Sequence, residues 1–211
     1  MFTVYTIGHS THSHEQLLKL LKEKDINCVV DVRSVPYSRY ANLYNREVLK
    51  AFLNTNKIIY LFMGKELGAR QASPLLYTPE GYLDFEKTSK SDVFRSGIKR
   101  VLVGLEKNYI IALMCTEKDP IDCHRAILVG KELKEVGCSV RHILEDGKIE
   151  TQEELEMRMI NTCFPDWRQL SLFAEQDSIL QKDELIIKAY RQKNTEIGYK
   201  QESEQEEVTN A

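Results

Sequence analysis

The sequence predicts a single α/β domain of the doubly wound type, a Rossmann-like three-layer arrangement in which a mostly parallel sheet carries helices on both faces. Short apolar runs alternate along the chain with amphipathic helical segments, which is the pattern of such a sheet. Two of the runs, residues 28–32 and 109–115, are apolar almost throughout, as expected for strands buried on both faces. The 211 residues suffice for one domain with an extension, so we assign residues 1–160 to the domain and 161–211 to a tail.

The first half of the domain alternates strand and helix. Residues 2–8 predict a strand, and Ser13 is a suitable N-cap for a helix over residues 14–24, whose leucines lie on one side. The pattern then predicts a strand over 28–32, a polar and aromatic loop over 33–45, a helix over 46–54 and a strand over 58–62.

The second half repeats the alternation after a loop that contains Gly64, Gly68 and Pro74. Gly137 is typical of a helix C-cap and ends the helix expected from residue 123. The predicted elements are a helix over 92–107, a strand over 109–115, a helix over 123–136 and a strand over 139–144.

The tail differs from the domain in composition. Residues 161–211 carry six basic and ten acidic side chains, so the acidity of the chain, which has a net charge of −3, belongs to the tail. We expect one helix over 179–192 and a disordered acidic end from Gln201 to Ala211.

Composition also bounds the function. No apolar run approaches the ~20 residues that cross a bilayer, and the N-terminal segment lacks the pattern of a secretory signal. Five cysteines is an odd number, and Cys28 and Cys138 adjoin apolar runs, so a reduced, cytoplasmic protein fits better than a disulfide framework. No bulk basic charge demands nucleic acid, and the oligomeric state stays open.

The most informative segment is the loop between Cys115 and Arg125. It contains two thiols, an imidazole, a guanidinium and acidic groups between a buried strand and a helix start. Loops at the carboxyl end of a parallel sheet carry the chemistry of α/β proteins, and a helix N-terminus lowers a nearby thiol pKa and attracts anions. We therefore expect Cys115 to be a nucleophile of lowered pKa.

Other polar residues follow the remaining strands, so a parallel sheet would bring them to the same edge. Each has a structural alternative: a strand cysteine is usually core, an aspartate often caps a turn, and His142 can be a satisfied core group. The expected catalytic residues are Cys115, His9, Glu117, His124 and Asp31, with His9 or His124 as the acid–base group. The expected substrate- or anion-binding residues are Ser10, Arg33, Arg39, Tyr60, Arg70 and Arg125, of which Arg33, Arg39 and Arg125 should converge on one pocket.

The loop from Arg33 to Arg46 interleaves three arginines with three tyrosines. Guanidinium groups match phosphate oxygens, and tyrosine rings stack on bases. The loop therefore suggests a nucleotide or nucleic acid, and the alternative is a solvated surface loop.

A metal site is a further possibility. Cys115, Cys123 and His124, together with His9, offer enough soft ligands for Zn²⁺, although the spacing of the two cysteines and His124 matches no common zinc signature. The leading interpretation needs no cofactor, and zinc is the alternative.

Four motifs carry a family resemblance: Thr6-Ile7-Gly8-His9-Ser10, Asp31 to Arg39, Leu67-Gly68-Ala69-Arg70, and Leu113 to Glu117 with Cys123-His124-Arg125. Over residues 2 to about 160 the chain resembles the family called domain of unknown function 488, which implies no activity. A fainter similarity is to rhodanese-like domains, which also place Asp-Val-Arg after a strand and a cysteine in a strand-to-helix loop. The loop from Cys115 to Cys123 is longer here, which argues against sulfur transfer.

In the tail, Gln169-Leu170-Ser171-Leu172-Phe173 resembles the pentapeptide by which bacterial replication and repair proteins bind the sliding clamp. Leu170, Leu172 and Phe173 would enter an apolar groove and Gln169 would hydrogen-bond at its rim. The alternative is that these residues begin a helix that packs on the domain.

The sequence thus favours a Cys-dependent enzyme that acts on a nucleotide or nucleic acid in DNA metabolism and is recruited by its tail. A zinc-binding protein and a non-catalytic nucleic-acid-binding module remain the alternatives.

Overall fold

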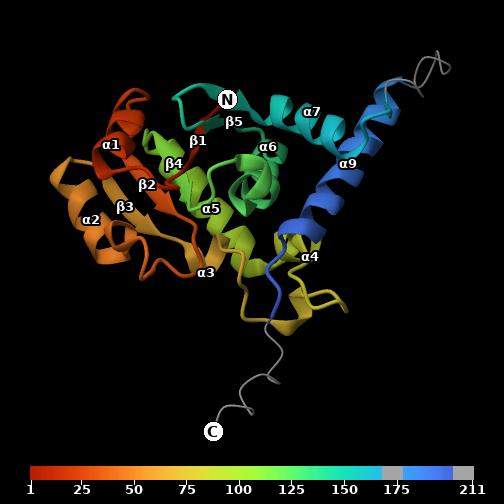
Figure 1. The fold of residues 1–211 in the computed structure, drawn as a ribbon, viewed down its shortest axis with the longest axis horizontal. Coiled ribbons are helices and arrows are strands. Elements are labelled where there is room, and N and C mark those ends of the chain that lie inside the picture. The colour runs from red at the N-terminus through yellow and green to blue at the C-terminus, as the bar shows by residue number, and fades with distance from the viewer. Residues whose placement is uncertain (168–177, 202–211) are drawn as a thin grey trace, which may run out of the picture.

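The computed structural model describes residues 1–167 and 178–201. It contains a six-stranded sheet in the order β3-β2-β4-β1-β5-β6, in which only β6 runs antiparallel to its neighbour (Figure 1). The strands are β1 (Thr3–Gly8), β2 (Cys28–Asp31), β3 (Ile59–Phe62), β4 (Ile111–Cys115), β5 (Ser139–Ile143) and β6 (Ile149–Thr151). The predicted α/β class with a mostly parallel sheet is confirmed.

Helices cover both faces of the sheet, which confirms the three layers. Helices α1 (His14–Lys22) and α2 (Arg46–Thr55) bury Leu17, Leu21, Leu49 and Leu53 against one face. The other face is covered by α5 (Asp92–Glu106), the π-helix η4 (Arg125–Gly130), α6 (Lys131–Glu135) and α7 (Gln152–Cys163). Shorter elements are η1 (Asn42–Tyr44), α3 (Gly64–Leu67), η2 (Pro74–Leu76), α4 (Phe85–Lys90) and η3 (Pro120–Asp122).

The alternation of side chains along the strands decides which core each residue joins. In β4, Leu113 and Cys115 belong to the core under α5 and η4, whereas Met114 belongs to the core under α1 and α2. In β2, Val30 faces the α5 side and Val29 the opposite one. Polar side chains at neighbouring strand ends are therefore separated onto the two faces of the sheet.

Two predicted helix ends are confirmed at the level of single residues. The Ser13 hydroxyl accepts a hydrogen bond from the backbone N–H of Gln16 and caps α1. Gly137 follows α6 with a φ of +90°, a backbone conformation that glycine adopts without strain.

The segment predicted as one helix from residue 123 to 136 differs from the prediction. It begins as the π-helix η4 after His124 and continues as α6. π-Helical turns are rare and occur often at functional sites. Here the turn begins immediately after the Cys123-His124 pair.

Beyond residue 143 the chain is more structured than its pattern suggested. Strand β6 and helix α7 follow β5, and Thr151 forms a capping box with Glu154 at the start of α7. Helix α9 (Ser178–Ile197) lies beside α7 in Figure 1 and packs against it, where the Tyr190 hydroxyl donates to Glu156 Oε1 at 2.9 Å. This part of the predicted tail thus joins the body. The pentapeptide from Gln169 to Phe173 lies outside the described residues.

None of the helices within the described ranges combines the length and apolar character that a bilayer span requires.

Candidate functional site

Three neighbouring strands end together at one edge of the sheet. Gly8 of β1 pairs with Cys115 of β4, and Asp31 of β2 pairs with Met114 one residue earlier. The backbone N–H groups of His9 and Ser10 continue this register by donating to the carbonyls of Cys115 and Thr116, each at 2.9 Å. Parallel pairing therefore brings the predicted residues of β1, β2 and β4 to one place.

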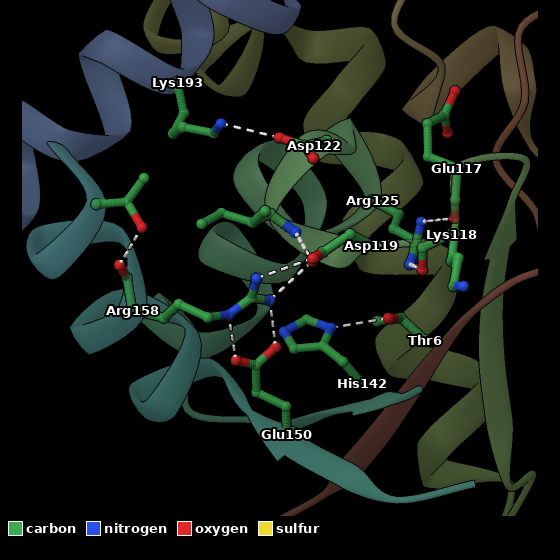
Figure 2. A network of polar contacts seen from close by, with 12 residues as sticks. Thr6, Glu117, Lys118, Asp119, Asp122, Arg125, His142, Glu150, Arg158 and Lys193 are labelled. Carbon is green, nitrogen blue, oxygen red and sulfur yellow. Dashed lines mark hydrogen bonds and ion pairs between the residues drawn. The ribbon is translucent and has the colours of Figure 1, made fainter. Parts of the chain in front are cut away.

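The loop after Cys115 is held by arginine and lysine side chains from three elements (Figure 2). Arg125 of η4 donates to the carbonyls of Glu117 and Lys118 at 2.7 and 3.1 Å. Arg158 of α7 forms a bidentate pair with Asp119 at 2.9 and 2.7 Å. The loop that follows Cys115 is thus held in place by Arg125 at its own end and by Arg158 from a helix farther along the chain.

The end of α9 adds a further restraint, because Lys193 Nζ donates to Asp122 at 2.9 Å (Figure 2). A glycine is also required at the contact with β1: a Cβ on Gly8 would lie 1.9 Å from the Glu117 carbonyl oxygen. The loop between the two cysteines is therefore closely packed on both sides.

Four side chains of this loop converge. The carboxylate oxygen Oε2 of Glu117 lies 2.8 Å from Cys115 Sγ and 3.0 Å from Cys123 Sγ. His124 Nδ1 lies 3.8 Å from Cys115 Sγ and 3.9 Å from Cys123 Sγ. Both thiols and the imidazole are buried, whereas Glu117 is exposed as a residue but turns its carboxylate inward.

The orientation of His124 is set by the backbone. Its Nε2 lies 3.0 Å from the carbonyl oxygen of Val32, so this nitrogen must carry the proton and donate. In the neutral ring the lone pair then belongs to Nδ1, the atom that faces both thiols. Metal-binding histidines have this arrangement, with the second nitrogen bonded to a carbonyl or carboxylate.

The two cysteines differ in electrostatics. Burial, together with the neighbouring Cys123 and Glu117, raises the pKa of Cys115 well above its usual value. Burial also acts against ionisation of Cys123, but the hydrogen bond from Cys115 and the charge of Arg125 lower its pKa well below the usual value. The expectation that Cys115 holds the activated thiolate is therefore reversed, because the charge of Arg125 acts on Cys123, whereas His124 lies equally close to both thiols.

The charge of the Cys123 thiolate changes the pKa values of Glu117 and His124. Burial and the charge of Cys123 raise the pKa of Glu117. Burial alone would lower the pKa of His124, but the hydrogen bond with Cys123 and its charge raise the value overall.

A second polar cluster lies on the opposite face of the same edge. Arg33 donates to both carboxylate oxygens of Asp31 at 2.9 and 2.6 Å, and the Tyr60 hydroxyl donates to Asp31 at 2.6 Å. Arg33 Nη1 also lies 3.3 Å from Nε2 of His9, whose ring stacks on Tyr44 with the centroids 3.8 Å apart. Burial and the charge of Arg33 lower the pKa of His9 to about 4, so His9 is neutral and accepts from Arg33.

A cavity of about 260 Å³ opens on the cysteine cluster. Its lining includes Cys115, Cys123 and His124, together with Arg33, Arg70 and Tyr199. The guanidinium of Arg70 lies over the Tyr199 ring, 4.2 Å from its centroid. A larger hollow of about 660 Å³ between α4, α6 and α9 contains none of the predicted site residues.

The predicted residues therefore separate into groups. The structure brings Cys115, Glu117, Cys123 and His124 together, and it places His9, Asp31, Arg33 and Tyr60 in the second cluster. Arg70 lines the cavity, Ser10 lies beside the loop with a φ of 42°, and His142 is a core group bonded to Thr6 and Gln152.

The expected convergence of three arginines does not occur in this structure. Arg33 lines the cavity but is paired with Asp31, Arg39 is exposed, and Arg125 is fully buried behind the loop. Tyr199 and Ile197, which complete the cavity wall, were not predicted, because nothing in the local pattern at the end of α9 indicates that these residues reach this cavity.

Comparison with known proteins identifies the family. Searches of curated proteins and of solved structures found no match. The family model described as domain of unknown function DUF488 matches residues 13–131, a range that contains both cysteines of the cluster, His124, Asp31 and Arg33 but neither His9 nor α9. Since this match covers more than half of the chain, the protein belongs to the DUF488 family.

Proposed function

We propose that Cys115, Cys123 and His124 bind a zinc-type ion and that the protein is a hydrolytic enzyme acting on a nucleotide or nucleic acid. One observation carries the proposal: the three ligand atoms lie within 4.8 Å of one another, and all three residues are buried. Soft thiolate and imidazole ligands favour Zn²⁺ over the hard cations Mg²⁺ and Ca²⁺.

The distances support such an ion. With Zn–S of about 2.3 Å and Zn–N of about 2.0–2.1 Å, tetrahedral geometry separates a sulfur from a nitrogen ligand by roughly 3.5 Å. The separations from His124 Nδ1 to the two sulfurs are 3.8 and 3.9 Å, so these two sulfur–nitrogen separations need only a few tenths of an ångström of adjustment. Hydrogen bonding of Nε2 to Val32 already orients the ring for binding through Nδ1.

Charge balance supports it as well. Arg125 is fully buried, and within the described residues it forms no ion pair and its Nε has no hydrogen-bond partner. Two thiolates and the Glu117 carboxylate would carry three negative charges, which a divalent ion and Arg125 would neutralise. Buried charges are tolerated when they are balanced in this way.

The cavity favours a catalytic ion over a structural one. Catalytic zinc sites keep three protein ligands and one open position, and here the cavity opens on the three residues. A bound ion would lower the pKa of a coordinated water to about 7. The ion would supply an activated water for hydrolysis, in which the substrate forms a bond to the water oxygen as its bond to the leaving group breaks, and Glu117 would be the residue that accepts the proton of the water and donates it to the leaving group.

Metal analysis of the purified protein tests the proposal. We expect one zinc per chain, loss of zinc in Cys123→Ser and Cys115→Ser, and retention in the control Cys163→Ser, because Cys163 lies outside the cluster. Replacement by Co²⁺ should produce a sulfur-to-cobalt charge-transfer band, and Glu117→Gln should retain the ion. Equal metal content in Cys123→Ser and the unaltered protein would refute the site.

A thiol enzyme is the second candidate, since the cavity also reaches Cys123, the cysteine of lowered pKa. In that case the protein would contain no metal as purified, and iodoacetamide would alkylate one thiol at neutral pH much faster than a free cysteine. Loss of the fast reaction in Cys123→Ser but not in Cys115→Ser would assign the nucleophile. A cytoplasmic, reducing setting would keep both thiols free for either chemistry.

Recruitment by a bacterial sliding clamp is proposed from the sequence alone. Burial of Leu172 and Phe173 at about 1.5–3 kcal/mol each, less ordering costs, suggests micromolar affinity. Replacing both residues by Ala should abolish clamp binding in surface plasmon resonance while leaving the Tm unchanged, and a large fall in Tm would instead show that the segment is core.

A further inference from the structure

The loop between β2 and α2 presents apolar and aromatic side chains to solvent, and we call residues 35–43 the Tyr–Arg loop. The exposed fractions are 100% for Tyr40, 59% for Tyr37, 53% for Val35 and 52% for Leu43. Single exposed hydrophobic residues are common, but several within one short loop indicate an interaction surface.

This exposure does not arise from a loosely held backbone. The Ser38 hydroxyl accepts from the N–H groups of Tyr40 and Ala41 at 3.1 and 3.2 Å, and the Ser38 N–H donates to Asn45 Oδ1 at 2.8 Å. The following Tyr44 is buried, and its hydroxyl donates to the His12 carbonyl at 3.0 Å. The loop is therefore anchored at its base while Tyr37 and Tyr40 remain free of the core.

The charge of the loop is of one sign. Between Asp31 and Glu47 the sequence contains no acidic residue, although the whole chain carries a net charge of −3. Arg33 is neutralised by Asp31, but Arg39 is exposed and forms no ion pair within the described residues. An aromatic loop with one unpaired arginine and no acidic residue is complementary to a polyanion whose bases can stack.

The loop leads to the cavity over the cysteine cluster. Ser34 and Val35 line that cavity, and the Ser34 hydroxyl accepts from the backbone N–H of Arg70 at 2.9 Å. Figure 1 shows the stretch between β2 and α2, in orange, at the end of the sheet where α3 lies. A strand bound along the loop would therefore reach the cavity mouth, where Arg70 forms no ion pair within the described residues.

We propose that the Tyr–Arg loop binds single-stranded nucleic acid, with Tyr37 and Tyr40 stacking on bases and Arg39 and Arg70 contacting phosphates. Stacking on side chains requires bases that are not already stacked in a duplex, so a single strand is the expected form. The substrate role of that strand rests on the proposed function, because the cysteine cluster would act on the nucleotide at the cavity mouth. Binding by the loop itself does not require the ion.

Fluorescence anisotropy with a labelled oligothymidylate of about twelve nucleotides tests the proposal on the full chain. Tyr37→Ala with Tyr40→Ala should weaken binding by about 100-fold, because each lost stack costs roughly tenfold. The matched control is Tyr109→Ala, since Tyr109 is 38% exposed but precedes β4 at the opposite end of the sheet, and it should leave affinity unchanged.

Salt dependence and strandedness sharpen the test. Arg39→Ala should reduce the slope of log K against log salt by the amount that corresponds to about one phosphate contact. A duplex of the same length should bind more weakly than the single strand. Equal binding by the double tyrosine variant, tighter binding of the duplex, or no binding of any oligonucleotide would overturn the proposal, and the last result would favour a protein partner.

The two proposals can fail separately. Cys123→Ser should lose zinc while keeping oligonucleotide affinity, and the double tyrosine variant should keep zinc while losing that affinity. Loss of zinc in the tyrosine variant would show that the loop supports the cluster instead of binding a strand, and would overturn the inference.

Discussion

Two buried polar clusters lie at the same edge of the sheet, on opposite faces, and they differ in how completely they are satisfied. Around Arg33, Asp31 supplies the opposite charge, and Tyr60 and His9 complete the hydrogen bonds. Among the described residues, the guanidinium of Arg125 donates only to carbonyl groups, while two thiols, an imidazole nitrogen and a carboxylate converge nearby.

This difference between the two clusters indicates which of them is a functional site. When protein groups satisfy all the charges and hydrogen bonds of a buried cluster, a structural role is enough to account for it. A buried cluster of two thiols, an imidazole and a carboxylate, beside an arginine that has no carboxylate partner among the described residues, is where we propose that an ion binds. The predictions below test this contrast.

The largest effect is expected from breaking the cluster around Asp31 and Arg33, which we call the closed cluster because its charges are paired. Asp31→Ala would leave the Arg33 guanidinium buried without its partner and remove the acceptor of Tyr60, so the free energy of unfolding should fall by about 3–5 kcal/mol. Urea denaturation measures this loss. Asp31→Leu combined with Arg33→Met serves as the control, since removal of both charges should cost much less. A loss below about 1 kcal/mol in Asp31→Ala would mean that the pair is not desolvated.

The pH dependence of the same cluster follows from His9, whose pKa is lowered to about 4 by burial and Arg33. The unfolded chain, with a histidine pKa of about 6.5, binds more protons than the folded one below that pH, so stability falls on acidification. Between pH 6.5 and 4.5 His9 should contribute a loss of about 2 kcal/mol. His9→Gln should show a shallower dependence in urea titrations, and an identical slope would contradict the low pKa. His142, lowered to about 3 by burial and Arg125, should keep a residual slope in that variant.

In the cluster around Cys115, Cys123 and His124, which we call the open cluster, substitutions should act mainly by changing the affinity for the proposed ion. Arg125→Met removes the positive charge that balances the thiolates, so zinc affinity should fall about 10–100-fold, in line with the loss of other groups that support a metal site. Competition with a chromophoric chelator measures the affinity. In chelator-treated protein the substitution should cost less stability than in the zinc-loaded form, and an equal cost in both forms would show that Arg125 supports only the loop.

The sequence anticipated the open cluster better than the closed one. Cys115, Glu117, Cys123 and His124 lie within ten residues, and parallel pairing brings such loops to one edge, so their convergence followed from local patterns. The assignment of Arg33 and Arg125 to one anion pocket failed because Arg33 pairs with Asp31 and Arg125 is fully buried on η4, where it donates to the carbonyls of the loop.

Other parts depend on long-range packing or on weak signals. Tyr199 reaches the cavity through contacts of α9, more than 70 residues after Cys123, and nothing local indicates this. The π-helix after His124 has no sequence signature of its own. Helix α7, in contrast, could have been found, since Thr151 and Glu154 have the spacing of a capping box.

The smallest effect should come from Arg158, a partly exposed arginine that holds the loop after Cys115 through Asp119. Arg158 pairs with Asp119 and Glu150, and its side chain is 36% exposed, so solvent screens the pairs. Arg158→Met should lower stability by about 1–2 kcal/mol, less than Asp31→Ala, because the side chain of Asp119 stays 45% exposed and only Glu150, which is 12% exposed, loses its partner with little access to solvent. Thermal unfolding at low and high salt measures it, and the difference from the unaltered protein should shrink as salt rises. A loss of stability as large as that of Asp31→Ala would mean that the fold of the loop after Cys115 depends on Arg158. Arg158 would then count, like Arg33, as part of a buried polar cluster that stabilises the protein.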